Sequence, residues 1–219
     1  MMNYKAVIFD MDGTILNTLD DLADATNRAL EKNSLPVRTT GEVRNFVGNG
    51  IQKLIERAVP AGTAAAVIEK VNADFSAYYA KHCADKTQPY AGIAAMLASL
   101  RAAGIKTAVV SNKDDYAVQT LARVYFPAMF DAVAGVLSGI RKKPAPDTVF
   151  EVMKRLAVEK EQCVYVGDSE VDIETAGNAG IPCISVAWGF KGRTFLEEHN
   201  AQKIVDTVSQ LSAALLSCW

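Results

Sequence analysis

Residues 7–16 read Val-Ile-Phe-Asp-Met-Asp-Gly-Thr-Ile-Leu and decide the fold of this chain. The apolar run that ends at Phe9 has the length and the β-branched content of a buried parallel strand. Gly13 ends the run, because glycine turns the backbone sharply at little steric cost. Asp10 and Asp12 are therefore expected at the carboxyl end of a strand, where open α/β sheets bind ligands.

Two acids one residue apart beside a glycine turn are open to more than one interpretation. They suit an oxygen-rich cation site, a nucleophile with its acid/base partner, or both. The structural alternative is a polar strand end that caps the next helix. The order of polar residues further along the chain helps to choose between these interpretations.

Length, charge and hydropathy limit the class of protein. With 219 residues, the chain can form one large domain or two modest ones around a sizeable core. Its net charge of -2 gives no electrostatic reason to expect binding to nucleic acid or to an anionic membrane. No apolar run approaches the roughly 18 residues of a membrane span, and the first residues lead directly into the predicted strand. We therefore expect no signal peptide and no membrane segment.

The cysteines favour a reducing compartment. They lie too far apart in sequence for a zinc knuckle or a redox pair, and we expect them to be small buried residues in a cytoplasmic protein. These residues are Cys83, Cys163, Cys183 and Cys218.

Hydrophobic periodicity divides the chain into a helical block and an alternating α/β region. We expect no strand between residues 15 and 85, where the pattern predicts helices over residues 17–31, 41–46, 51–58 and 63–85. The later region alternates between the hydrophobic period of a strand, two residues, and that of a helix, about 3.6 residues. Strands are predicted over residues 105–110, 130–136, 162–166 and 183–186, and helices over residues 93–103, 116–124, 148–156, 172–179 and within 207–216.

This alternation predicts an α/β fold with a doubly wound parallel sheet. The helical block is inserted after the first strand, so the core would be formed by residues 1–16 and 86–219. Residues 17–85 would then form an all-helical cap over the ligand-binding edge of the sheet.

Polar residues follow three of the predicted strands, and a further polar residue lies on a loop. Right-handed crossovers bring Asp10, Ser111 and Asp168 to the same sheet edge. Ser111 and Asn112 offer a hydroxyl and amide groups at an expected helix start, which suit an anion such as phosphate. Lys143 adds a cation on a proline-stiffened loop.

Each of these clusters also has a purely structural interpretation. Ser111 and Asn112 could cap a helix, and Lys143 could be a solvated surface lysine. Asp168 and Asp172 could be helix caps that interact with the helix dipole. The joint occurrence of acids, a hydroxyl and a lysine in this order favours one shared site.

This order of motifs resembles the haloacid-dehalogenase superfamily of phosphohydrolases. The similarity covers nearly the whole chain and is closest to the phosphoglycolate-phosphatase-like group, which carries a helical (C1-type) cap after the first motif. Four segments match the motifs of the superfamily in order, namely Phe9 to Thr14, Val110 to Lys113, Lys142 to Pro146, and Gly167 to Asp172. The first and fourth motifs are highly specific, whereas the second and third are weak alone.

The resemblance implies a role for each matching residue. Asp10 would be the nucleophile that becomes an aspartyl phosphate, and Asp12 would be the general acid and base. Mg²⁺ would be held by the Asp10 carboxylate, the Asp12 carbonyl and Asp168.

The other matching residues would bind phosphate or support the site. Ser111, Asn112 and Lys143 would bind the remaining phosphate oxygens. Asp172 and Glu170 would contact metal-bound water or orient the lysine.

The resemblance also limits the activity. The dehalogenases of the superfamily lack the second acid of the first motif, so the presence of Asp12 argues against dehalogenation. The implied activity is hydrolysis of a small phosphorylated metabolite, with phosphoglycolate as the leading candidate. Pyrophosphate, nucleoside monophosphates and sugar phosphates stay open as substrates, and a monomer or a homodimer is expected.

Two other functions stay open at this point. A phosphomutase of the β-phosphoglucomutase kind would share the cap type and the nucleophile. A phospho-accepting receiver module would share the acidic pocket, but it lacks the Asp-x-Asp-Gly-Thr motif and an inserted cap. Within the cap, Asn49 could contact the substrate, and the alternative is that it forms an ordinary turn between two helices.

Overall fold

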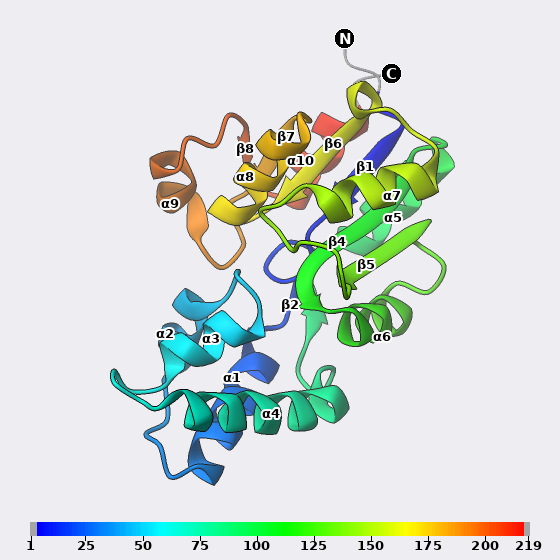
Figure 1. Cartoon of the computed structure of the whole chain (residues 1–219). Coiled ribbons are helices and arrows are strands. Elements are labelled where there is room, and N and C mark those ends of the chain that lie inside the picture. The colour runs from blue at the N-terminus through cyan, green and yellow to red at the C-terminus, as the bar shows by residue number, and fades with distance from the viewer. Residues whose placement is uncertain (1–3, 217–219) are drawn as a thin grey trace.

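The computed structural model describes residues 4–216 and confirms the doubly wound parallel sheet. The strand order is β5-β4-β1-β6-β7-β8, and every neighbouring pair in this sheet is parallel. β1 therefore lies inside the sheet, with β4 on one side and β6 on the other (Figure 1). The strands are β1 Ala6–Phe9, β4 Lys106–Asp114, β5 Ala132–Val136, β6 Cys163–Gly167, β7 Cys183–Val186 and β8 Ile204–Val205.

Both faces of the sheet are covered, which explains why β1 is apolar at every position. Val7 and Phe9 belong to one buried cluster, and Ala6 and Ile8 belong to another. This alternation follows from the period of two in a β-strand. The first cluster is completed by α5 Ile93–Ala102, α6 Asp115–Tyr125 and α10 Val208–Leu216, and the second by α7 Asp147–Leu156 and α8 Glu170–Ala179.

Four helices follow β1 as one inserted block and lie beyond the carboxyl end of β1 (Figure 1). The chain enters and leaves this helical block through two short strands that pair with each other in antiparallel fashion. The helices are α1 Leu19–Lys32, α2 Thr40–Phe46, α3 Ile51–Ala58 and α4 Ala65–His82, and the two strands are β2 Leu16–Asn17 and β3 Gln88–Pro89.

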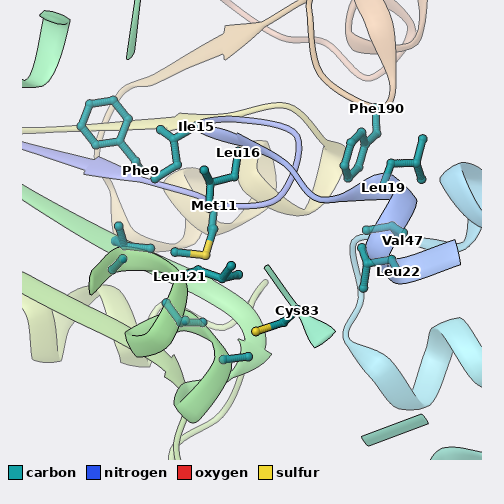
Figure 2. Close-up of a cluster of buried hydrophobic side chains, with 14 of the residues drawn as sticks. Phe9, Met11, Ile15, Leu16, Leu19, Leu22, Val47, Cys83, Leu121 and Phe190 are labelled. Carbon is teal, nitrogen blue, oxygen red and sulfur yellow. The ribbon is translucent and has the colours of Figure 1, made fainter. Parts of the chain in front are cut away.

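The helical block shares a buried apolar cluster with one face of the sheet. In Figure 2, Phe190 from the loop after β7 lies beside Leu19 of α1, and Leu22 and Val47 lie next to them. The hydrophobic contacts thus continue from the core into the block without a polar break at this point.

Several sequence expectations need correction. β2 is a strand in the region where none was expected, although it is only two residues long. β4 continues to Asp114, so Ser111 and Asn112 lie in an extended segment and not at a helix start, because α6 begins at Asp115. Four further short elements were not predicted, namely β3, the 3-10 helix Lys160–Gln162, α9 Gly192–Glu198 and β8.

The environment of the cysteines agrees in part with the expectation. Cys83 and Cys163 are buried, Cys183 is partly buried, and Cys218 lies outside the described residues.

Between residues 4 and 216, the structure contains no helix of the length and apolarity that a bilayer crossing requires.

Candidate active site

Asp10 and Lys143 form the centre of the site. Asp10 is the first residue after β1, and its backbone N–H donates to the carbonyl of Val166 over 2.8 Å, which fixes it against β6. Its Oδ1 lies 2.8 Å from Nζ of Lys143, and both residues are buried. Burial raises the pKa of Asp10 to about 7, with Lys143 opposing the rise. The lysine thus brings a positive charge directly to this carboxylate.

Asp172 holds Lys143 in place. Its Oδ1 lies 2.7 Å from Nζ of Lys143, and its Oδ2 accepts hydrogen bonds from the hydroxyl and the backbone N–H of Ser169. The hydroxyl of Tyr165 also lies 3.1 Å from Nζ of the lysine. Burial would lower the pKa of Lys143, but Asp10 and Asp172 raise it well above its usual value, so the lysine is charged.

Asp168 lies directly after β6 and is fixed by contacts from two loops. Its Oδ2 accepts the backbone N–H of Phe190 over 2.7 Å, and Thr14 donates its hydroxyl to Oδ1 over 3.4 Å. Burial raises the pKa of Asp168 well above its usual value, and the nearby carboxylates Asp172 and Asp10 add to the rise. A cation at this carboxylate would relieve that repulsion.

Asp12 lies near the same edge but is held by different donors. Its Oδ1 accepts a hydrogen bond of 2.6 Å from the hydroxyl of Thr18, which precedes α1. The same oxygen lies 3.1 Å from Nζ of Lys113. Asp12 is therefore oriented from the sheet and from the start of the helical block together.

Ser111 and Asn112 line the site at the end of β4. The Asn112 amide donates to the carbonyls of Gly48 and Lys143, over 3.2 and 3.0 Å, so its side-chain donors are already used. Its Oδ1 is buried and has no hydrogen-bond partner. A phosphate contact of Asn112 would therefore use its backbone N–H.

Glu170 and Asn49 do not line the pocket that contains Asp10. Glu170 Oε2 is buried without a hydrogen-bond partner, and the residue does not line the pocket that contains Asp10. The Asn49 side chain accepts a hydrogen bond of 2.8 Å from Arg57 within the helical block. The backbone of Gly48 and Gly50, on either side of Asn49, lines the pocket instead.

The pocket has a polar floor and a largely apolar roof. Its floor contains the carboxylates and lysines of the sheet edge, and its roof comes from α1, α3 and the turn between α2 and α3. The apolar roof residues are Leu22, Val47, Ile51 and Leu54, and Phe190 joins them from the loop after β7. Figure 2 shows Leu22, Val47 and Phe190 of this set. The pocket thus lies between the sheet edge and the inserted helices.

Sequence reasoning missed two contributors to the site. The loop after β7 supplies the Phe190 N–H to Asp168, and it could have been found because β7 ends at the same sheet edge as β1 and β6. Lys113 was noted only as part of a motif, and nothing in its sequence position indicates the distant partner that it meets on α4.

The family model of haloacid dehalogenase-like hydrolases matches residues 7–186, which is most of the chain. The chain therefore belongs to the haloacid dehalogenase-like hydrolase family. It is a hydrolase of the phosphatase type, as its relatives and structural neighbours indicate.

The phosphoglycolate phosphatase of Colwellia psychrerythraea is 31% identical over 221 residues, which cover 96% of each chain. The phosphoglycolate phosphatase of Pseudomonas syringae pv. tomato is 30% identical, and the match covers 94% of this chain and 78% of that enzyme. A crystal structure from Lactobacillus delbrueckii subsp. bulgaricus, described as a candidate phosphoglycolate phosphatase, has 41% identity and a TM-score of 0.92. It covers 98% of this chain and 99% of its own.

Hydrolases of this family generally use a divalent metal, and the acidic cluster fits one. Asp10, Asp168 and Asp172 are buried, and each offers a carboxylate oxygen within 4.8 Å of the others. Both oxygens of Asp172 are already engaged, Oδ1 by Lys143 and Oδ2 by Ser169, whereas Lys143 contacts only Oδ1 of Asp10. Asp10 and Asp168 are therefore better suited than Asp172 to contact a cation. Gly13 and Gly189 pack so closely on Asp168 that a Cβ at either would lie 2.3 Å from it. The cluster is therefore a fixed set of hard oxygen donors.

Proposed function

We propose that this chain is a Mg²⁺-dependent phosphomonoester hydrolase that acts on a small phosphorylated metabolite through an aspartyl phosphate on Asp10. The observation that carries the proposal is the convergence of Asp10, Lys143 and Asp168 in one buried pocket beneath inserted helices. Phosphoglycolate is the leading substrate, because curated relatives of similar length carry that activity in their names.

The reaction would proceed in two steps. Asp10 attacks phosphorus, the bond from phosphorus to the leaving oxygen breaks, and Asp12 gives its proton to that oxygen. Water then attacks the phosphorus of the aspartyl phosphate and gives a proton to Asp12. This second step releases inorganic phosphate and regenerates the Asp10 carboxylate.

The surrounding residues would stabilise charge during both steps. Lys143 is charged and held by Asp172, so it would place a fixed positive charge beside a phosphate oxygen. Ser111 offers a buried hydroxyl at the same edge. Mg²⁺ held by Asp10, the Asp12 carbonyl and Asp168 would neutralise the negative charges of nucleophile and phosphate when bound.

The helical block of residues 17–85 would act as a cap over a core formed by residues 1–16 and 86–219. Its apolar residues complete the pocket and would exclude bulk water during the reaction. Among the described residues, Lys191 is the lysine of this pocket with no carboxylate at ion-pair distance, because Lys113 and Lys143 are both paired. Lys191 is thus the cation available to the carboxylate of phosphoglycolate.

A substrate panel tests this proposal. Phosphate release is measured with and without Mg²⁺ for phosphoglycolate, ethyl phosphate, a sugar phosphate, a nucleoside monophosphate and pyrophosphate. We expect metal-dependent hydrolysis with the highest kcat/KM for phosphoglycolate. Ethyl phosphate is the matched control, because it has similar size and lacks the carboxylate.

The variant Asp10→Asn tests the nucleophile. We expect its turnover to fall by at least about 10³-fold, because an amide cannot form the acyl phosphate. The melting temperature should show that the variant is folded. Turnover close to that of the wild type would exclude the aspartyl-phosphate route.

A further inference from the structure

Lys113 is a buried lysine whose partners come from two different parts of the molecule. Its side chain is 3% exposed, and lysine is rarely buried without a partner. Nζ lies 3.1 Å from Oδ1 of Asp12, and it donates over 2.8 Å to the hydroxyl of Tyr79 on α4. Lys113 therefore joins an acid beside the sheet to a helix of the inserted block.

Tyr79 is itself firmly placed. It is buried, and its ring stacks on that of Phe75 one turn earlier in α4, with ring centroids 5.3 Å apart. Nζ of Lys113 also lies 4.5 Å from the centroid of the Tyr79 ring, a distance that suits a cation–π contact. The position of the lysine head therefore depends on the position of α4.

The contacts of Lys113 divide the two oxygens of Asp12 into different roles. Oδ1 is occupied by Lys113 and by the hydroxyl of Thr18. Within residues 4–216, Oδ2 accepts no hydrogen bond, so Oδ2 is the oxygen left to carry a proton. A carboxyl group fixed in this way presents its proton in one direction, which general acid catalysis requires.

We propose that Lys113 is a positioning residue that, held by Tyr79, orients Asp12 for proton transfer when α4 lies against the sheet edge. The inference rests on the proposed function, in which Asp12 protonates the leaving oxygen. The proton moves from Oδ2 of Asp12 to that oxygen while its bond to phosphorus breaks and the bond from Asp10 to phosphorus forms. Lys113 and Tyr79 keep their own protons and touch neither reacting atom.

The test compares two substrates that differ in their need for an acid. The leaving alkoxide of ethyl phosphate must be protonated, whereas p-nitrophenolate leaves from p-nitrophenyl phosphate without a proton. The value of kcat/KM reports the steps up to release of the leaving group, so it isolates this requirement.

We expect Lys113→Met to lower kcat/KM for ethyl phosphate by about 100-fold and Tyr79→Phe to lower it by about tenfold, since a positioned acid contributes roughly 10² to 10⁴. For p-nitrophenyl phosphate, both variants should stay within about threefold of the wild type. Tyr79→Phe removes only a hydroxyl and should leave the fold intact, so it supports the result if Lys113→Met is poorly folded.

Tyr125→Phe is the matched control. It also loses a tyrosine hydroxyl near the junction of block and core, where that hydroxyl donates to the carbonyl of Thr87 over 2.7 Å. It should change kcat/KM for the two substrates to the same small extent. The inference would be overturned if Tyr79→Phe lowered kcat/KM equally for both substrates, or if it left kcat/KM for ethyl phosphate unchanged. A wild-type enzyme that hydrolyses neither substrate would instead contradict the proposed function.

Discussion

At the scale of single residues, glycines decide how the acids are packed. A Cβ added at Gly13 or Gly189 would lie 2.3 Å from atoms of Asp168, and one at Gly167 would lie 2.3 Å from Asp172. Atoms at such distances overlap, so any side chain at these positions must displace a carboxylate. Gly13 additionally has a φ of +81°, which disfavours other residues there.

Gly189→Ala is therefore expected to weaken metal binding without unfolding the protein. Its Cβ would push Asp168 away, and displaced support around a metal ligand commonly costs about 10- to 100-fold in affinity or activity. Mg²⁺ titration of activity measures the change. The control is Gly177→Ala in α8, where the added Cβ would meet no atom within 4 Å apart from its chain neighbours and the backbone of its own helix. That variant should keep its affinity and gain up to about 1 kcal/mol of stability. Unchanged Mg²⁺ affinity in Gly189→Ala would contradict the packing argument.

The residues that the sequence identified and those that it missed differ in one physical respect. Asp10, Ser111 and Asp168 each follow the apolar run of a strand, and the topology of parallel sheets alone brings such positions together. Lys113 also lies near the carboxyl end of a strand, but its significance depends on Tyr79, which lies 34 residues away on α4. Pairings of that kind depend on how α4 packs, and no local pattern encodes it.

At the scale of elements, the turn between α2 and α3 is docked on the core through its backbone. The carbonyls of Gly48 and Asn49 in this turn, and that of Asn45 at the end of α2, accept hydrogen bonds from core side chains. The donors are Asn112, Lys142 and Lys191 respectively. Because the acceptors are main-chain atoms, the docking does not require particular side chains in the turn.

Lys142→Ala should therefore raise KM by about two- to fivefold and leave kcat nearly unchanged, since an exposed charged hydrogen bond contributes about 1 kcal/mol or less. Nζ of Lys142 donates to the Asn49 carbonyl over 2.9 Å but does not line the pocket. Steady-state kinetics on the preferred substrate measure the effect. Lys154→Ala, at an exposed site on α7, is the control and should change neither constant. A fall in kcat with KM unchanged would argue against docking by this lysine.

The elements with strong periodicity were predicted, and the short ones were not. Strands such as β1 and β6 are buried on both faces and form apolar runs that are visible in sequence. β2, β3 and β8 have two residues each, which is too short to show a period. β4 exceeds its apolar run because residues 111–114 stay extended with a shift in register beside β5.

At the scale of the whole molecule, a cluster of buried acids works against stability at neutral pH when no cation is bound. Burial raises the pKa of Asp10 to about 7 and that of Asp168 well above its usual value. The folded state then binds more protons than the unfolded chain between about pH 4 and pH 7. The contribution of these groups to stability is therefore present at low pH and is lost as the pH rises through the folded pKa.

The metal-free protein should melt at a lower temperature at about pH 8 than at about pH 5.5, and Mg²⁺ should raise the melting temperature more at the higher pH. Calorimetry in EDTA and in excess Mg²⁺ at the two pH values measures both effects. Asp168→Asn should reduce the pH dependence, because it removes one of the raised carboxyl groups. Equal stabilisation by Mg²⁺ at both pH values would show that the acids are not protonated in the metal-free fold.

The short antiparallel pairing of β2 with β3 has a consequence for how this architecture can vary. Leu16 faces Pro89 and Asn17 faces Gln88, so the chain returns beside the point from which it left. In terms of connectivity, the intervening residues 18–87 are one long loop of a hairpin. Insertions, deletions or a wholly different domain at that position would leave the register of the parallel sheet unchanged. Under the proposed function, the part of the molecule that would meet the leaving group could therefore change while the residues that would bind phosphate keep their places.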